Sequence, residues 1–90
     1  MKIKPLVWTE HCHVDGDLLV VSNTPMCKFY FTVYDGVTVL NRRAFNMASD
    51  TTVNKIICRL TDGSRDDQMA EAKRVAQAEH DRQVLALVEE

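Results

Sequence analysis

Residues 28–40 read KFYFTVYDGVTVL. Aromatic and β-branched residues precede Asp35-Gly36, β-branched residues follow it, and Asp-Gly is a preferred two-residue turn in β-hairpins. A turn of two residues places Tyr34 opposite Val37 and thereby determines every other cross-strand pair. The stretch therefore predicts an antiparallel hairpin of defined register.

The register sorts the side chains of the hairpin onto two faces, because neighbouring residues of a strand point to opposite sides. The first face is expected to be core and carries Phe29, Phe31, Val33 and Leu40. The second face is a candidate partner-binding surface and carries Tyr30, Thr32, Tyr34, Val37 and Val39. Both faces are apolar enough to be buried, so both need a partner.

Three more segments have strand character. Residues 18–21 and 53–60 are rich in aliphatic side chains, and residues 3–8 are a third candidate that Pro5 confines to an edge or an irregular start. Thr24-Pro25 marks a break between the first of these strands and the hairpin.

Alternation along residues 53–60 predicts two faces for that strand as well. We expect one face to hold Ile56, Cys58 and Leu60 and the other to hold Ile57 and Arg59. Residues 46–52 are small and polar, which favours a connection without regular structure.

The periodicity changes after Gly63. Ser64 is a candidate N-cap, Asp66 and Asp67 place acids in the first turn, and neither Gly nor Pro follows. We predict one helix over residues 64–89. At 100° per residue one stripe of this helix faces the sheet and holds Met69, Ala72, Ala76, His80, Gln83 and Leu87.

These elements predict an α+β fold. An antiparallel sheet of four or five strands occupies residues 1–62, and the C-terminal helix packs on one of its faces. The chain has 90 residues, 46% of them apolar, which is the size of a single domain over residues 1–90. A domain of this size buries only about 60–65% of its unfolded surface, so a deep catalytic cleft and an enzymatic activity are not expected.

Charge and cysteine content further narrow the classes of protein to which this chain can belong. The net charge of −2 supports neither a strongly basic nucleic-acid-binding protein nor a polyanion. No stretch approaches the roughly 20 apolar residues of a membrane span, so we expect a cytoplasmic protein. The three cysteines, Cys12, Cys27 and Cys58, are interpreted as thiols, the last two as small core residues.

Several side chains allow a functional and a structural interpretation. His11-Cys12-His13 carries zinc-binding groups, but the second spaced pair of a zinc site is missing, so we interpret it as a solvated loop and expect no metal or cofactor. His80 is interpreted as a core-edge residue bonded to a strand carbonyl rather than a pH switch, and Trp8 as a core anchor rather than an interface residue.

Lys28, Arg42 and Arg43 are candidate phosphate contacts. Lys28 lies near the two arginines across the hairpin if its pairing extends that far. Without an interleaved stacking pattern, a solvated rim is the simpler interpretation. Nucleic-acid binding is therefore the alternative function, with Lys55 and Arg59 as additional cations of the sheet.

The two ends of the chain resemble a known group of proteins. Residues 3–8 read IKPLVW and residues 72–82 read AKRVAQAEHDR, similar to small phage- and prophage-encoded proteins that open with Lys-Pro-Leu-x-Trp and close with an alanine-rich helix. Their central Thr-Pro-Phe-Gly segment corresponds to Thr24-Pro25-Met26-Cys27, which departs from the pattern at its last two positions. The resemblance implies a phage origin. By analogy with other phage accessory proteins it implies inhibition of a host defence system such as CRISPR-Cas.

The leading functional hypothesis follows from how much of the sheet a single helix can cover. One helix covers one face of a sheet, and the second face of this hairpin is apolar rather than polar. A host protein, a second copy of the chain in a homodimer, or a reversed assignment of the two faces would each explain this. We expect a non-enzymatic protein that binds and occludes a host protein. A small enzyme using His11, Cys12 or His13 is a third hypothesis.

Overall fold

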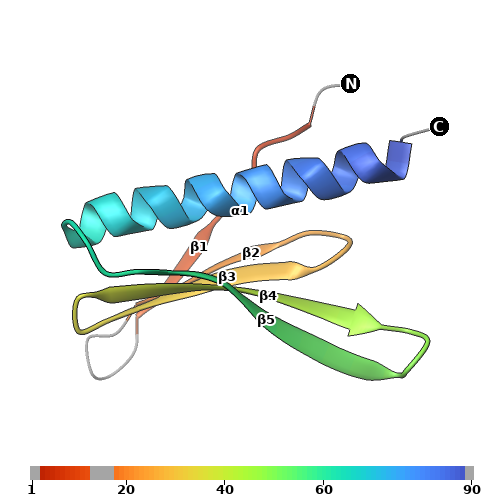
Figure 1. Ribbon diagram of the computed structural model, residues 1–90, viewed down its shortest axis with the longest axis horizontal. Helices are drawn as coiled ribbons and strands as arrows, with labels where there is room; N and C mark the ends of the chain where they lie inside the picture. Colours follow the sequence, from red (N-terminus) through yellow and green to blue (C-terminus); the bar gives the residue numbers. More distant parts are fainter. Residues whose placement is uncertain (1–2, 13–17, 89–90) are drawn as a thin grey trace.

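The computed structural model describes residues 3–12 and 18–88. Five strands form one antiparallel sheet in the order β1-β2-β3-β4-β5, and α1 lies across one face of it (Figure 1). The predicted α+β fold is confirmed. The elements are β1 (Thr9–Cys12), β2 (Leu18–Asn23), β3 (Lys28–Tyr34), β4 (Val37–Asn46), β5 (Thr51–Leu60) and α1 (Arg65–Val88).

The β3–β4 hairpin has the predicted register. Tyr34 pairs with Val37 and Phe31 pairs with Leu40. Asp35 and Gly36 adopt φ angles of 51° and 77°, and two positive values in succession are typical of the type I′ turn that Asp-Gly favours. The local chemistry of the turn thus determines which side chains share a face.

The core lies between α1 and the face predicted for it. Phe29, Phe31 and Leu40 are completely buried, and so are Ala72 and Ala76 on the helix. Side chains this small allow a helix to approach a sheet that large aromatic rings already fill. Residues that complete the buried cluster are Leu18, Val20, Cys27 and Val33.

Trp8 and His80 pack against the core as predicted, but the hydrogen bond expected of His80 is missing. Trp8 packs on Phe31 with ring centroids 5.4 Å apart, as expected of a core anchor. His80 is 9% exposed and meets Phe29 edge-on. Its Nδ1 atom has no hydrogen-bond partner among the described residues, so the expected bond to a strand carbonyl is not found.

The start of α1 is tied to the hairpin turn. Ser64 Oγ accepts a hydrogen bond from the Asp67 N–H at 3.2 Å, which is N-cap geometry. One turn further on, the buried Gln68 side chain accepts a bond from Thr38 Oγ1 at 2.8 Å and donates one to the Gly36 carbonyl at 2.9 Å. A single amide therefore joins the helix to β4 and to the β3–β4 turn.

The expected strand over residues 3–8 is wrong. These residues have no regular structure, and β1 begins only at Thr9. Pro5 has no N–H to give to a strand ladder, and the next N–H, that of Leu6, donates to Gln77 Oε1 on α1 at 2.7 Å. The segment therefore packs with the helix on the core side instead of extending the sheet.

The expected connection over residues 46–52 is too long. β4 continues to Asn46 and β5 begins at Thr51, so only residues 47–50 form the turn. Asn46 Oδ1 accepts the Ala48 N–H at 3.0 Å, and Asp50 takes a φ of 54°. Because the Asn46 side chain closes a short turn, the residues on either side of it can pair as strands. This pairing overrides the weak strand preference of small polar residues.

A β-bulge in β5 corrects a second prediction. Leu40 pairs with Cys58 but Asn41 pairs with Ile56, which leaves Ile57 as an extra residue. Ile57 and Cys58 both pack against the core, whereas Ile56 turns to the opposite face and is 55% exposed. The bulge therefore separates Ile56 from Cys58 and Leu60, with which simple alternation had grouped it.

Candidate interaction face of the sheet

The sheet face opposite α1 has no cover among the described residues; we call it the open face (Figure 1). Its centre is the set predicted from the hairpin, and Tyr34 within that set is 63% exposed. Side chains of the set are half-buried or exposed, in contrast to the fully buried Phe29 and Phe31. The residues are Tyr30, Thr32, Tyr34, Val37 and Val39.

Three further apolar residues belong to the open face. Leu19 pairs with Thr32, and Val21 pairs with Tyr30, so both lie beside the predicted set. Ile56 joins them through the bulge. Sequence reasoning missed all three, because residues 18–21 are continuously apolar and show no alternation, and because a bulge leaves no local signal at this position.

The β4–β5 hairpin extends past the rest of the sheet. β3 begins at Lys28, which pairs with Arg43. The residues of β4 beyond Arg43 therefore pair with β5 alone. This part of the hairpin bends away from α1 (Figure 1). It carries exposed apolar side chains, Phe45, Met47 and Val53. Phe45 extends the open face onto this protruding arm, whereas Val53 pairs with Ala44 and lies on the helix side.

The three candidate cations do not share one surface. Lys28 and Arg43 are cross-strand partners on the open face. Arg42 pairs with the buried Phe29 and so lies on the helix side, where the Gln83 amide oxygen accepts its Nε–H at 2.7 Å. Arg59, opposite Val39, is a further cation of the open face. Alternation within β4 accounts for the separation of Arg42 from Arg43.

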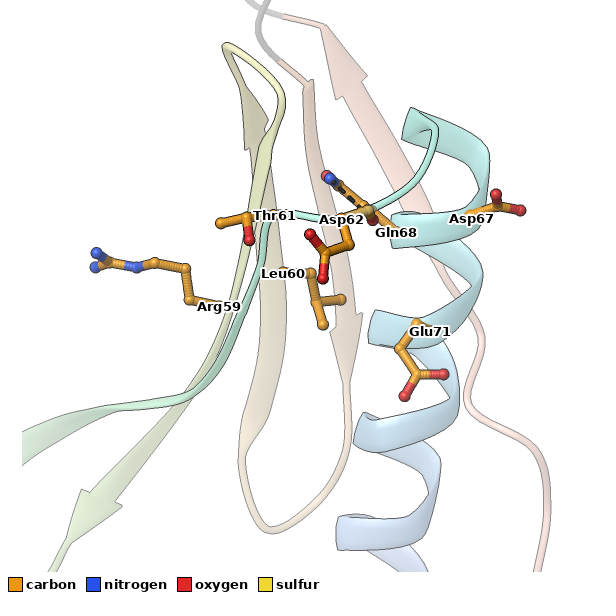
Figure 2. Close-up of a pocket in the computed structure, with 7 residues that line it drawn as sticks. All are labelled: Arg59, Leu60, Thr61, Asp62, Asp67, Gln68 and Glu71. Carbon is orange, nitrogen blue, oxygen red and sulfur yellow. Dashed lines mark hydrogen bonds between the residues drawn. The ribbon is translucent and has the colours of Figure 1, made fainter.

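A concave region lies outside the open face, where β5 meets the start of α1 (Figure 2). It has a volume of about 340 Å³ and is lined on the helix side by Asp67, Gln68 and Glu71. Figure 2 shows Gln68 reaching toward the strands while the Arg59 side chain points away from the helix. Glu71 is held in an ion pair with Arg74. Gln68 is thus engaged in joining the helix to the sheet, and Glu71 in an ion pair along α1.

The thiol of Cys58 lies close enough to this region to be affected by it. Burial raises the pKa of Cys58, and the negative charge of Glu71 raises it further. Since the thiolate is the reactive form, a raised pKa lowers the reactive fraction at any given pH. We expect Glu71→Gln to speed alkylation of Cys58 by iodoacetamide at mildly alkaline pH, measured by mass spectrometry of the peptide containing Cys58.

Glu79→Gln is the matched control for this prediction. Glu79 forms the equivalent ion pair with Arg82 two turns along α1, so the same charge is removed from the same type of contact. We expect this variant to alkylate at the wild-type rate. Equal rates at Cys58 in the two variants would contradict an influence of Glu71.

The candidate zinc ligands and nucleophiles of residues 11–13 lie at the edge of the part of the chain that the structure describes. His11 is exposed on β1 opposite Leu19, and His13 lies outside the described residues. Within residues 3–12 and 18–88, no three His, Cys, Asp or Glu side chains gather as a metal site would require. No helix in the same part of the chain is long and apolar enough to cross a membrane.

Comparisons with known proteins return no relative. No protein-family model matches the chain, and neither a curated protein nor a solved structure matches it. The chemistry of the open face is therefore the main indication of function.

Proposed function

We propose that this protein is a non-enzymatic binding protein that uses the open face and the adjoining arm to hold another protein. The observation that supports the proposal most directly is the position of Tyr34, Ile56 and Phe45, large apolar side chains that are each more than half exposed. Large exposed apolar side chains gathered on one face are typical of a site of protein contact. Binding of this type needs shape and exposed apolar area, and no reacting group.

The resemblance to phage proteins suggests the biological setting of this binding. In that setting the partner is a host protein, such as a component of a CRISPR-Cas or related defence system, and the bound protein occludes the working surface of its target. A flat face with a projecting arm suits steric occlusion, because standard-sized interfaces need only about 800 Å² from each partner.

Tyr34→Asp is expected to abolish partner binding. A carboxylate placed within an apolar interface loses its hydration without gaining a counterion, whereas the same side chain is well hydrated in the free protein. Tagged wild-type protein and the variant are purified from lysate of a bacterial host, and the amount of each co-purifying protein is quantified. We expect one or more proteins to be recovered with the wild type and lost with the variant.

Two further variants make the result specific. Tyr34→Phe keeps the ring and is expected to retain binding, and Leu85→Asp places the same new charge at an exposed apolar residue of α1, away from the open face. All variants should keep the wild-type Tm. Equal recovery of the same proteins with wild type and Tyr34→Asp would place the interface elsewhere.

Nucleic-acid binding is the competing function, favoured by the pairing of Lys28 with Arg43 beside Tyr30 on one face. Single-stranded nucleic acid is held by cations together with stacked aromatic rings, and its affinity falls steeply with salt. Titration of the protein with oligothymidylate at several salt concentrations separates the two functions. A steep logarithmic salt slope would favour nucleic acid, and a flat response would favour the protein interface.

A further inference from the structure

A shallow depression on the open face is lined by Leu19, Val21, Lys28, Tyr30 and Arg43, with a volume of about 240 Å³. We propose that this depression receives a carboxylate side chain of the protein partner, flanked by an apolar side chain. The inference depends on the proposed function, because it names the chemistry that one part of the open face recognises. We call the depression the acid-binding pocket.

Two like charges lie side by side in the acid-binding pocket. Lys28 and Arg43 are directly opposite each other in the β3–β4 ladder, so their Cβ atoms are about 5 Å apart and the two cations repel each other. Among the described residues, no carboxylate forms an ion pair with either side chain. A carboxylate from another molecule would relieve the repulsion and bond to both cations at once.

An apolar wall borders these cations. Leu19 and Val21 line the pocket on the β2 side, and Tyr30 lies between them and the charges. The Tyr30 hydroxyl donates to Asn54 Oδ1 at 3.5 Å, which ties the ring to β5. Charge-assisted bonds are stronger beside apolar surface than in bulk water. The wall also gives an apolar neighbour of the incoming carboxylate a surface to contact.

The charged strand residues of the open face are all positive. The strands place Lys28, Arg43 and Arg59 on the open face, while Glu10, the one carboxylate among the described strand residues, pairs with the buried Val20 on the helix side. Two open faces packed against each other would bring cations together without a counterion. An acidic protein partner fits better than a second copy in a face-to-face dimer.

The aliphatic lining of the acid-binding pocket favours a protein over a nucleic acid as its ligand. Leu19 and Val21 line the pocket beside its single tyrosine, and aliphatic side chains offer no flat ring on which a base can stack. They do offer contact to aliphatic or aromatic side chains of a polypeptide. The pocket therefore suits an acidic residue next to an apolar one.

The experiment uses a library of random peptides displayed on a carrier and selected against the immobilised full-length protein. We expect the enriched peptides to share an Asp or Glu beside an apolar residue. A representative peptide is then synthesised, together with its Asn or Gln counterpart, and its affinity is measured by fluorescence anisotropy. Arg43→Glu is expected to weaken binding of the acidic peptide by about tenfold or more while leaving its amide counterpart nearly unaffected.

Arg65→Glu is the charge-matched control. Arg65 is exposed at the start of α1, so this variant changes the net charge equally without altering the pocket. It should bind the acidic peptide as the wild type does. Arg43→Glu should also keep or raise the Tm, because it replaces the repulsion of Lys28 by an attraction; loss of binding therefore cannot be attributed to unfolding.

The remaining outcomes separate this inference from the proposed function. Peptides that Tyr34→Asp loses but Arg43→Glu retains would overturn the acid-binding pocket and leave the open face as the interface. Enrichment of no peptide, or of peptides indifferent to both variants, would overturn both proposals. Oligothymidylate binding lost in Arg43→Glu would identify the pocket as a phosphate site, and a dimer that Arg43→Glu dissociates would identify its occupant as a second copy.

Discussion

Phe31→Ala is expected to lower the free energy of unfolding by about 3–5 kcal/mol. Phe31 is completely buried, lies in the middle of β3 and packs against Trp8. Truncation removes the ring from the core and leaves a cavity that two neighbouring strands cannot collapse to fill. Urea denaturation followed by circular dichroism measures the change, with an unchanged slope as evidence that the folded state is otherwise retained.

The neighbouring aromatic residue on the open face provides the contrast. Tyr34 lies three residues further along β3 with its side chain on the opposite side of the sheet and 63% exposed. Tyr34→Ala is expected to cost less than about 1 kcal/mol, the range of a cross-strand contact on an exposed face. Comparable losses in the two variants would mean that both faces are buried, and the basis for an open face would then be gone.

The second large effect is expected at Gln68. Gln68→Leu removes the acceptor of the completely buried Thr38 hydroxyl and the donor to the Gly36 carbonyl. A buried hydroxyl left without a partner costs about 1–3 kcal/mol, and with the other lost bond we expect about 2–4 kcal/mol in total. Thermal and urea unfolding measure the loss.

A double-mutant cycle with Thr38→Val tests the cause. Because Val replaces the hydroxyl by a methyl group of similar shape, Gln68→Leu with Thr38→Val should cost clearly less than the sum of the two single changes. The exposed bond between Ser49 and Thr51 serves as a control, and Ser49→Ala should change stability by less than about 0.5 kcal/mol. Strict additivity at Gln68 and Thr38 would exclude a direct coupling.

Both predictions concern the side of the molecule that the sequence describes best. Asp35-Gly36 specified the turn, the turn specified the register, and alternation then placed Phe29 and Phe31 in the core and Tyr30 on the opposite face. Each step depends on contacts within one hairpin, which is why it could be predicted. The helix was equally accessible, since Ser64 as N-cap and the spacing of Ala72 and Ala76 are local patterns.

Errors arose wherever a residue was placed by contacts with a distant part of the chain. Residues 3–8 have a strand-like composition, but the bond from the Leu6 N–H to Gln77 directs them to the helix. Ile56 obeys simple alternation until the bulge at Ile57, which is a property of the β4–β5 pairing as a whole. No pattern within residues 53–60 predicts this bulge.

The same division applies to the candidate site. By itself the sequence determined the two faces of the central hairpin and the single helix that covers one of them, because turn geometry and side-chain periodicity act over a few residues. Only the tertiary structure decided that Leu19 and Val21 border Tyr30, that the β3–β4 pairing extends as far as Lys28 and Arg43, and that the β4–β5 hairpin extends as an arm. Those features depend on which strands are neighbours and in what register, and long-range packing sets both.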